Sequence, residues 1–326
     1  MSSKTIYFTD YSIVQDRERF DLDAEISPDT FERLVGAYHF QQEVICQVRV
    51  PSGVCHQKHK KGCLGVMKDG HEALIGSTCA NKYFKSDLKF VQEKKRIDAE
   101  IERQRIVGKY HTLMQDQDGL VSRLKSLHWE ALQLNAIMSD WYKKFQPGPL
   151  RFIYNAQKTA NWNVQIEVET ISTETYIEDG QEKTREISRW EPELLGHLSS
   201  ISEQGTSQRI VDEMKRIQTA FDFILTCDPK TVSFLKLKRA VTTLDEIDTI
   251  STKLQSLRAD CERFRRRENV QLLYFIQSSN DNVIKLLQQV LSIRGNNSSE
   301  SDARREEKRI IAAYSTVING RRFRFV

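Results

Sequence analysis

Four of the six cysteines lie between Cys46 and Cys79, and three histidines, His56, His59 and His71, lie among them. In a reducing compartment, clustered thiols are more often metal ligands than disulfides. Zinc prefers four tetrahedral ligands from cysteine and histidine. The sequence therefore predicts a structural zinc site in a segment that ends where a long helical pattern begins. We interpret His56 and His71 as surface residues or as residues that contact the ligands without binding the ion themselves.

Cys79 stands where a helix is expected to begin. Residues 62–67 and 72–75 are predicted to be two short strands joined by a Lys-Asp-Gly turn, which is a strong hairpin signal. A Gly-Ser-Thr-Cys sequence follows, in which Ser77 or Thr78 can cap a helix and Cys79 lies in its first turn. The dipole and the free amide groups at such a helix end favour a thiolate. We therefore expect Cys79 to be a ligand.

The other ligands come from the segment before this hairpin. Cys55 lies in a turn after a Pro-Ser-Gly break, and His59 is close enough along the chain to reach the same ion. Cys46, in a predicted strand, and Cys63, at the start of the hairpin, compete for the last position. We predict a zinc site formed by Cys46, Cys55, His59 and Cys79. Cys63 is the reserve ligand, because it would serve equally well as a buried strand residue.

The order of these parts, cysteines in a turn, then a hairpin, then Gly-x-x-Cys opening a helix, resembles the treble-clef class of zinc modules. The resemblance covers residues 46–84 and is carried by Asp69 and Gly70 and by the Leu-Ile-Gly-Ser-Thr-Cys-Ala sequence that starts at Leu74. It implies a zinc-binding module. The first half departs from the class, whose knuckle is a close cysteine pair, because eight residues separate Cys46 from Cys55.

Some treble clefs are nucleases, so a zinc-dependent nuclease is the enzymatic alternative. Those nucleases resemble ββα-metal folds, with a catalytic histidine in or before the hairpin and another histidine or an asparagine on the helix. Only Asn81 could take the helix position, and no convincing base remains once the histidines are drawn towards zinc. The chain also has no His-Glu-x-x-His pair, phosphate-binding glycine loop or Gly-x-Ser-x-Gly elbow. We therefore expect a non-catalytic protein.

The fold class predicted for the whole chain is α+β, mainly α. Residues 6–8 and 44–50 read as strands, and a helix is expected after Ser27 and Pro28. A charged helix is expected from residue 80 to about residue 113, followed by an interruption. Two apolar heptad stripes then indicate a coiled coil or a helix bundle. Their members are Leu120, Leu124, Leu127, Ala131, Leu134, Met138, Trp141 and Phe145 in the first, and Ile247, Ile250, Leu254, Leu257, Cys261 and Phe264 in the second.

A small antiparallel sheet is expected to interrupt the helices. Residues 150–188 have strand chemistry, with a hairpin turn at 178–181. Helices return after Pro192, and a polar linker leads to a tail in which Asn319 and Gly320 predict a type I′ hairpin turn. The predicted segments are a zinc module (1–84), long helices (85–146), a β insertion (147–190), a helical bundle (191–294), and a linker with a basic tail (295–326).

Composition gives only a weak indication of partners. The 49 Lys and Arg residues nearly balance the 45 Asp and Glu residues, so the net charge does not by itself indicate a polyanion. The first eight residues lack the apolar core of a signal peptide, and no apolar run reaches the roughly 20 residues that span a bilayer. We expect a cytoplasmic protein that does not bind a membrane.

The basic residues cluster locally, and this clustering suggests a function. Those expected to bind phosphates are Lys58, Lys60, Lys61, Lys82, Lys85, Arg265 and Arg266. Four aromatic residues near basic residues, Tyr83, Phe84, Phe323 and Phe325, could stack on unpaired nucleotides, although the first two more simply seal the zinc module. We predict a non-catalytic zinc-binding, coiled-coil protein that acts on DNA or RNA within an assembly. The alternative is a scaffold or oligomerisation subunit that binds only protein partners or a second copy through its heptad stripes.

Overall fold

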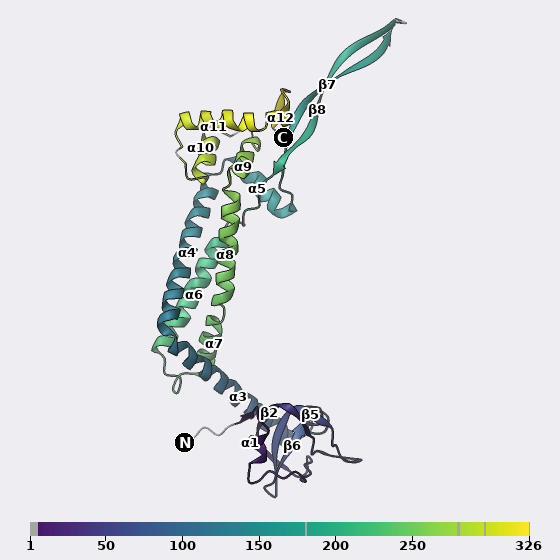
Figure 1. Ribbon diagram of the computed structural model, residues 1–326, viewed down its shortest axis with the longest axis vertical. Coiled ribbons are helices and arrows are strands. Elements are labelled where there is room, and N and C mark those ends of the chain that lie inside the picture. Colours follow the sequence, from purple (N-terminus) through teal and green to yellow (C-terminus); the bar gives the residue numbers. More distant parts are fainter. Residues whose placement is uncertain (1–5, 180, 279–280, 297, 326) are drawn as a thin grey trace. The chain divides into compact units, whose positions relative to one another are not determined.

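The computed structural model describes residues 6–179, 181–278, 281–296 and 298–325. The chain forms two compact units (Figure 1). The first contains Met1–Asp116 and Thr226–Val241, and the second contains Gln117–Leu225 and Thr242–Val326. Helices and several sheets are both present, so the expected mixed α+β class is confirmed. Among the described residues, no helix has the length and apolar character that crossing a bilayer requires.

A four-stranded sheet forms the centre of the first unit. Its strand order is β1 (Tyr7–Phe8), β2 (Phe31–Ile45), β5 (Lys58–Met67) and β6 (Glu72–Gly76). β1 runs parallel to β2, whereas the β2–β5 and β5–β6 pairs are antiparallel. Neighbouring residues of β5 belong to two different buried clusters, as the alternation of a strand requires. The sheet is therefore covered on both faces, with α1 (Ser12–Gln15) contributing to one of them.

The helix predicted after Ser27 and Pro28 is wrong, because this segment forms a turn followed by β2. The Ser27 amide donates to Thr30 Oγ1 at 2.9 Å, and the Phe31 amide donates to the Ser27 carbonyl at 2.9 Å. β2 then pairs with β5 from Phe31 to Ile45. Pairing with a distant strand thus overrides a local helix signal, which is only a weak preference.

The hairpin predicted before Cys79 is confirmed as β5 and β6. The strand predicted at residues 44–50 is divided into two. β2 ends at Ile45, and β3 (Arg49–Val50) pairs with β4 (Gly53–Val54) in a separate small hairpin. Gly53 has a φ of 119°, a backbone conformation that favours glycine, so this residue permits the tight turn between β3 and β4.

Cys79 lies in the first turn of α2 (Ser77–Tyr83), as predicted. The N-cap is Gly76, with no side-chain cap hydrogen bond, so the prediction that Ser77 or Thr78 caps the helix is wrong. The long helix predicted from residue 80 is interrupted after α2. A new helix, α3 (Leu88–Gln115), starts there with its own cap.

α3 is fixed to the sheet by polar contacts to one backbone position. The Leu34 amide donates to Glu93 at 3.0 Å, and Arg96 donates to the Leu34 carbonyl at 3.1 Å. At the other end of α3, the Tyr110 hydroxyl donates to the Cys227 carbonyl at 3.3 Å. The residues after Thr226, including the start of α7 (Phe234–Leu244), thereby belong to the first unit.

Helices form most of the second unit. They are α4 (Gln117–Lys144), α5 (Pro147–Thr159), α6 (Thr206–Thr226), α8 (Ile247–Phe264), α9 (Arg267–Gln271), a 3₁₀ helix at Leu272–Phe275, α10 (Val283–Ile293), α11 (Glu300–Ala313) and α12 (Ser315–Ile318). Within this unit α4, α6 and α8 lie side by side (Figure 1). Ser207 of α6 donates to Asn135 of α4 at 2.8 Å, and Lys253 of α8 forms an ion pair with Glu213 of α6 at 2.7 Å.

Both predicted heptad stripes are buried inside this unit. Every stripe residue on α4 and α8, and Phe145 just after α4, is buried. The two helices contact each other: the Trp141 and Phe264 ring centroids are 5.5 Å apart, and Arg258 forms an ion pair with Glu130 at 2.7 Å. The stripes therefore pack within one chain as part of a helix bundle.

A three-stranded antiparallel sheet interrupts the helices. Its strand order is β8 (Gln181–His197), β7 (Asn163–Glu178) and β9 (Phe323–Phe325). The predicted insertion and its turn are confirmed by the pairing of Glu178 with Gln181, although residues 150–159 are helical and β8 continues beyond Pro192. Gly180 of the predicted turn and Asn297 of the predicted linker lie outside the described residues.

The C-terminal tail is integrated into the second unit. Asn319 and Gly320 have φ values of 49° and 71°, as the predicted turn requires. They connect a helix, α12, to β9, so the predicted hairpin is wrong. Arg322 and Arg324 of the tail form ion pairs with Glu169 and Glu167 of β7.

Candidate metal centre

Backbone pairing brings the first two cysteines together. Cys46 directly follows β2, and Cys55 directly follows β4, so they flank the small β3–β4 hairpin. The Cys46 amide donates to the Gln57 carbonyl at 3.0 Å, and the Cys55 amide donates to the Val48 carbonyl at 2.9 Å. The eight residues between the two cysteines are thus folded back on themselves, which explains how a wide sequence spacing gives a close pair.

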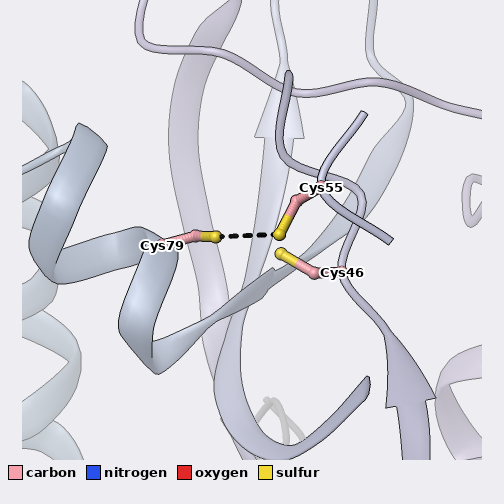
Figure 2. A group of neighbouring side chains, drawn as sticks. All are labelled: Cys46, Cys55 and Cys79. Carbon is pink, nitrogen blue, oxygen red and sulfur yellow. Dashed lines mark hydrogen bonds between the residues drawn. The ribbon is translucent and has the colours of Figure 1, made fainter. Parts of the chain in front are cut away.

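Cys79 reaches the same point from α2 (Figure 2). The Sγ atoms of Cys46, Cys55 and Cys79 all lie within 4.8 Å of one another, and those of Cys55 and Cys79 are 3.4 Å apart. Thiolates at about 2.3 Å from a tetrahedral zinc ion are about 3.8 Å from each other. Cys46 and Cys79 are buried and Cys55 is half-buried. This arrangement can hold a metal ion.

The thiols affect one another's ionisation. Burial raises the pKa of Cys46, against the hydrogen bonds that its sulfur accepts from the Gly76 and Val48 amides. Burial and the neighbouring Cys55 and Cys46 thiols raise the pKa of Cys79.

Cys55 differs from these two thiols. Burial also opposes its ionisation, but the Gln57 amide, the two other thiols and the Lys82 charge together lower its pKa. Because a bound cation favours thiolates, metal binding would reverse the preference for neutral thiols at the two buried positions.

His59 lies next to this group but not within it. Its ring packs near Tyr38, whose hydroxyl is 3.5 Å from His59 Nε2. The ring also lies over Gly76, where an added Cβ would come within 2.1 Å of His59 Cδ2. Burial lowers the pKa of His59, and its Nδ1 atom is buried without a hydrogen-bond partner among the described residues. The structure thus brings together three of the four predicted ligands, and the His59 imidazole is not among the groups that converge.

The reserve ligand Cys63 lies elsewhere in the core. It is buried on β5, opposite Ala37 on one side and Ile75 on the other, and is not part of the three-sulfur group. Burial raises the pKa of Cys63 to about 11. Its surroundings fit the alternative interpretation of a buried strand residue. His56 and His71 are exposed, as interpreted from the sequence.

The five predicted phosphate-binding lysines of the first unit are exposed. Lys58, Lys60 and Lys61 lie on β5, and Lys82 and Lys85 lie on α2 and just after it. Among the described residues, none of these five lysines forms an ion pair with a carboxylate. Other lysines of the same unit are paired, for example Lys89 with Glu32 at 2.8 Å. The sequence showed these lysines but not which of them lack an ion pair with the described carboxylates.

The other residues predicted to bind phosphates or to stack on bases lie in different structural environments. Arg265 and Arg266 are exposed at the end of α8, in the second unit. Phe84 is fully buried against Phe31 and Phe90, so its role is structural. Phe323 and Phe325 are half-buried on β9 and pack against the aromatic side chains of the 3₁₀ helix.

Sequence reasoning missed the part played by Gly76. Its amide donates to Cys46 and its missing side chain makes room for the His59 ring. The signal in the sequence is a glycine directly before Ser-Thr-Cys. Comparison with protein-family models, with curated proteins and with solved structures finds no match to this chain.

Proposed function

We propose that the first unit is a zinc-stabilised, treble-clef-like module in which Cys46, Cys55 and Cys79 bind the ion and His59 completes the set. The three converging sulfurs support this donor set, since cysteine and histidine are the ligands that structural zinc prefers. The unpartnered Nδ1 atom of His59 supports the fourth position, because a buried polar atom normally has a partner. The ring must turn towards the sulfurs to bind.

The proposed site is closed, and we infer that the protein is not an enzyme. Four protein ligands leave no open position for a substrate or a reactive water molecule, which distinguishes structural from catalytic zinc sites. Such an ion stabilises the fold and fixes the surface around it. The function then depends on what that surface binds.

We propose that this surface binds the phosphates of DNA or RNA within a larger assembly. The observation that carries the proposal is a set of five exposed lysines of the first unit that form no ion pair with a carboxylate among the described residues, Lys58, Lys60, Lys61, Lys82 and Lys85. Uncompensated positive charge attracts a polyanion and releases its counterions on binding. A scaffold that binds only proteins remains the second candidate, but the heptad stripes no longer favour it, because they are buried within the chain.

Salt-dependent binding tests the proposal. We expect wild-type affinity for short DNA and RNA strands, measured by fluorescence anisotropy, to fall steeply as salt rises from about 50 to about 300 mM. Reversing Lys58, Lys60 and Lys61 to Glu should lower affinity more than about tenfold and reduce the salt slope by about 3.

The matched control reverses Lys68, Lys95 and Lys236, which are exposed in the same unit and change the net charge equally. An equal loss of affinity in the control would mean that net charge, and not this lysine group, causes binding. Wild-type protein that binds neither nucleic acid would support the scaffold.

A further inference from the structure

Trp129 lies on the surface of the second unit. It is 64% exposed on α4, whereas the stripe residues Leu124, Leu127 and Ala131 of the same helix are buried. The other tryptophans are covered: Trp141 and Trp162 are 6% and 7% exposed, and Arg324 lies over the ring of Trp190 at 4.7 Å. Trp129 therefore does not serve the core of this unit.

The indole borders a concave site between α4 and α6. The cavity has a volume of about 490 Å³, and it is lined by Lys125, His128 and Trp129 of α4 and by Lys215, Gln218 and Thr219 of α6. Both helices belong to the second unit, and their packing is fixed by the Asn135–Ser207 hydrogen bond. The site is therefore built from two adjacent helices of one unit.

The lining is basic and contains no acidic side chain. Lys125 forms no ion pair with a carboxylate among the described residues. Lys215 has an acidic neighbour, Asp212, at 3.7 Å, but both side chains are more than half exposed, so solvent screens this pair. The site thus offers an uncovered aromatic face with positive charge on both helices beside it.

Two polar side chains complete the lining. Gln218, which lines the site, donates its amide to Asp222 at 2.8 Å and keeps its carbonyl oxygen as an acceptor. The Thr219 hydroxyl donates to the Lys215 carbonyl at 2.9 Å, which leaves its oxygen lone pairs as acceptors. Groups of this kind can accept hydrogen bonds from the edge of a nucleobase.

We propose that this cavity binds single-stranded nucleic acid, with an unpaired base stacked on Trp129 and the flanking phosphates bound by Lys125 and Lys215. Every base has an aromatic face, so stacking on an indole beside lysines is a sequence-tolerant way to bind single strands. This choice of ligand rests on the proposed function, nucleic-acid binding, but the residues of this site are different from the lysines of the first unit.

The test compares two probes with the same backbone charge. One is a short oligothymidylate, and the other is a matched oligomer of abasic residues, which carries the phosphates but cannot stack. We expect the wild-type protein to bind oligothymidylate more tightly than the abasic probe, with quenching of tryptophan fluorescence. Trp129→Ala should weaken oligothymidylate binding about tenfold, from a stacking contribution of about 1–3 kcal/mol, and leave the abasic probe unaffected.

Trp129→Phe is the matched control, because a phenyl ring can still stack, and it should keep most of the affinity. Equal affinity of the wild-type protein for both probes, or unchanged oligothymidylate binding by Trp129→Ala, would overturn the inference. If only the variant with Lys58, Lys60 and Lys61 reversed loses affinity for oligothymidylate, the proposed function is supported and the Trp129 site is contradicted. If only Trp129→Ala loses this affinity, the Trp129 site is supported and phosphate binding by the lysines of the first unit is contradicted.

Discussion

At the scale of single residues, the cysteines differ in what surrounds them. Cys46 lies just outside β2, where its sulfur can accept amide hydrogen bonds and face the other two thiols. Cys63 lies inside β5, between two paired strands, and is surrounded by core side chains. The sequence prediction chose Cys46 and kept Cys63 as the reserve, because both cysteines lie in strand-like segments. β2 ends at Ile45, so Cys46 lies outside the paired strands, whereas Cys63 lies within β5. Where β2 ends depends on its pairing with β5, which the local sequence does not show.

Metal content should depend on the cysteines of the three-sulfur group and not on Cys63. We expect about one zinc ion per chain in wild-type protein, measured by elemental analysis after gel filtration. Cys79→Ser should remove most of the metal, because it takes one of the three converging sulfurs away. Cys63→Ser is the control, since its sulfur is not part of the group, and it should keep the full content. Equal loss from both variants, or a folded wild-type protein without metal, would contradict the proposed site.

At the scale of helices and strands, local signals succeeded where an element's own residue pattern or a partner close in sequence determines the structure. The β5–β6 and β7–β8 hairpins and the stripe-bearing helices α4 and α8 follow the predicted patterns. The failures involve partners far away along the chain. β2 is fixed by β5, and β9 by β7, more than 150 residues earlier, so neither could be derived from its own segment.

The bundle helices give an element-scale prediction. Leu124 of α4 is 1% exposed, whereas Leu132 of the same helix is 38% exposed. Leu124→Asp buries an unpaired carboxylate and should lower the free energy of unfolding of the second unit by about 4 kcal/mol. Leu132→Asp should lower it by less than about 1 kcal/mol. Urea denaturation followed by tryptophan fluorescence measures both.

Protein concentration separates packing within the chain from packing between chains. Since both stripes are buried in one chain, the unfolding midpoint of the wild-type protein should not change with concentration. A midpoint that rises with concentration, together with dissociation of a dimer by Leu124→Asp, would instead indicate that the stripes join two copies.

At the scale of the whole molecule, the two units have different sources of stability. The first has a sheet with two buried clusters and the candidate metal centre, whereas the second has helix packing and a sheet closed by the C-terminal tail. All four tryptophans, Trp129, Trp141, Trp162 and Trp190, belong to the second unit. Tryptophan fluorescence therefore reports unfolding of the second unit alone, and circular dichroism reports both.

Removing the metal should consequently destabilise one unit and leave the other unchanged. With a chelator, we expect part of the thermal transition seen by circular dichroism to fall by about 12 °C or more, which corresponds to a loss of about 3 kcal/mol or more for a domain of this size. The transition seen by tryptophan fluorescence should not move. Cys79→Ser without chelator should reproduce the effect, and adding chelator to this variant should change nothing further. If the fluorescence transition fell by the same amount, the two units would unfold together and the metal would stabilise the whole chain.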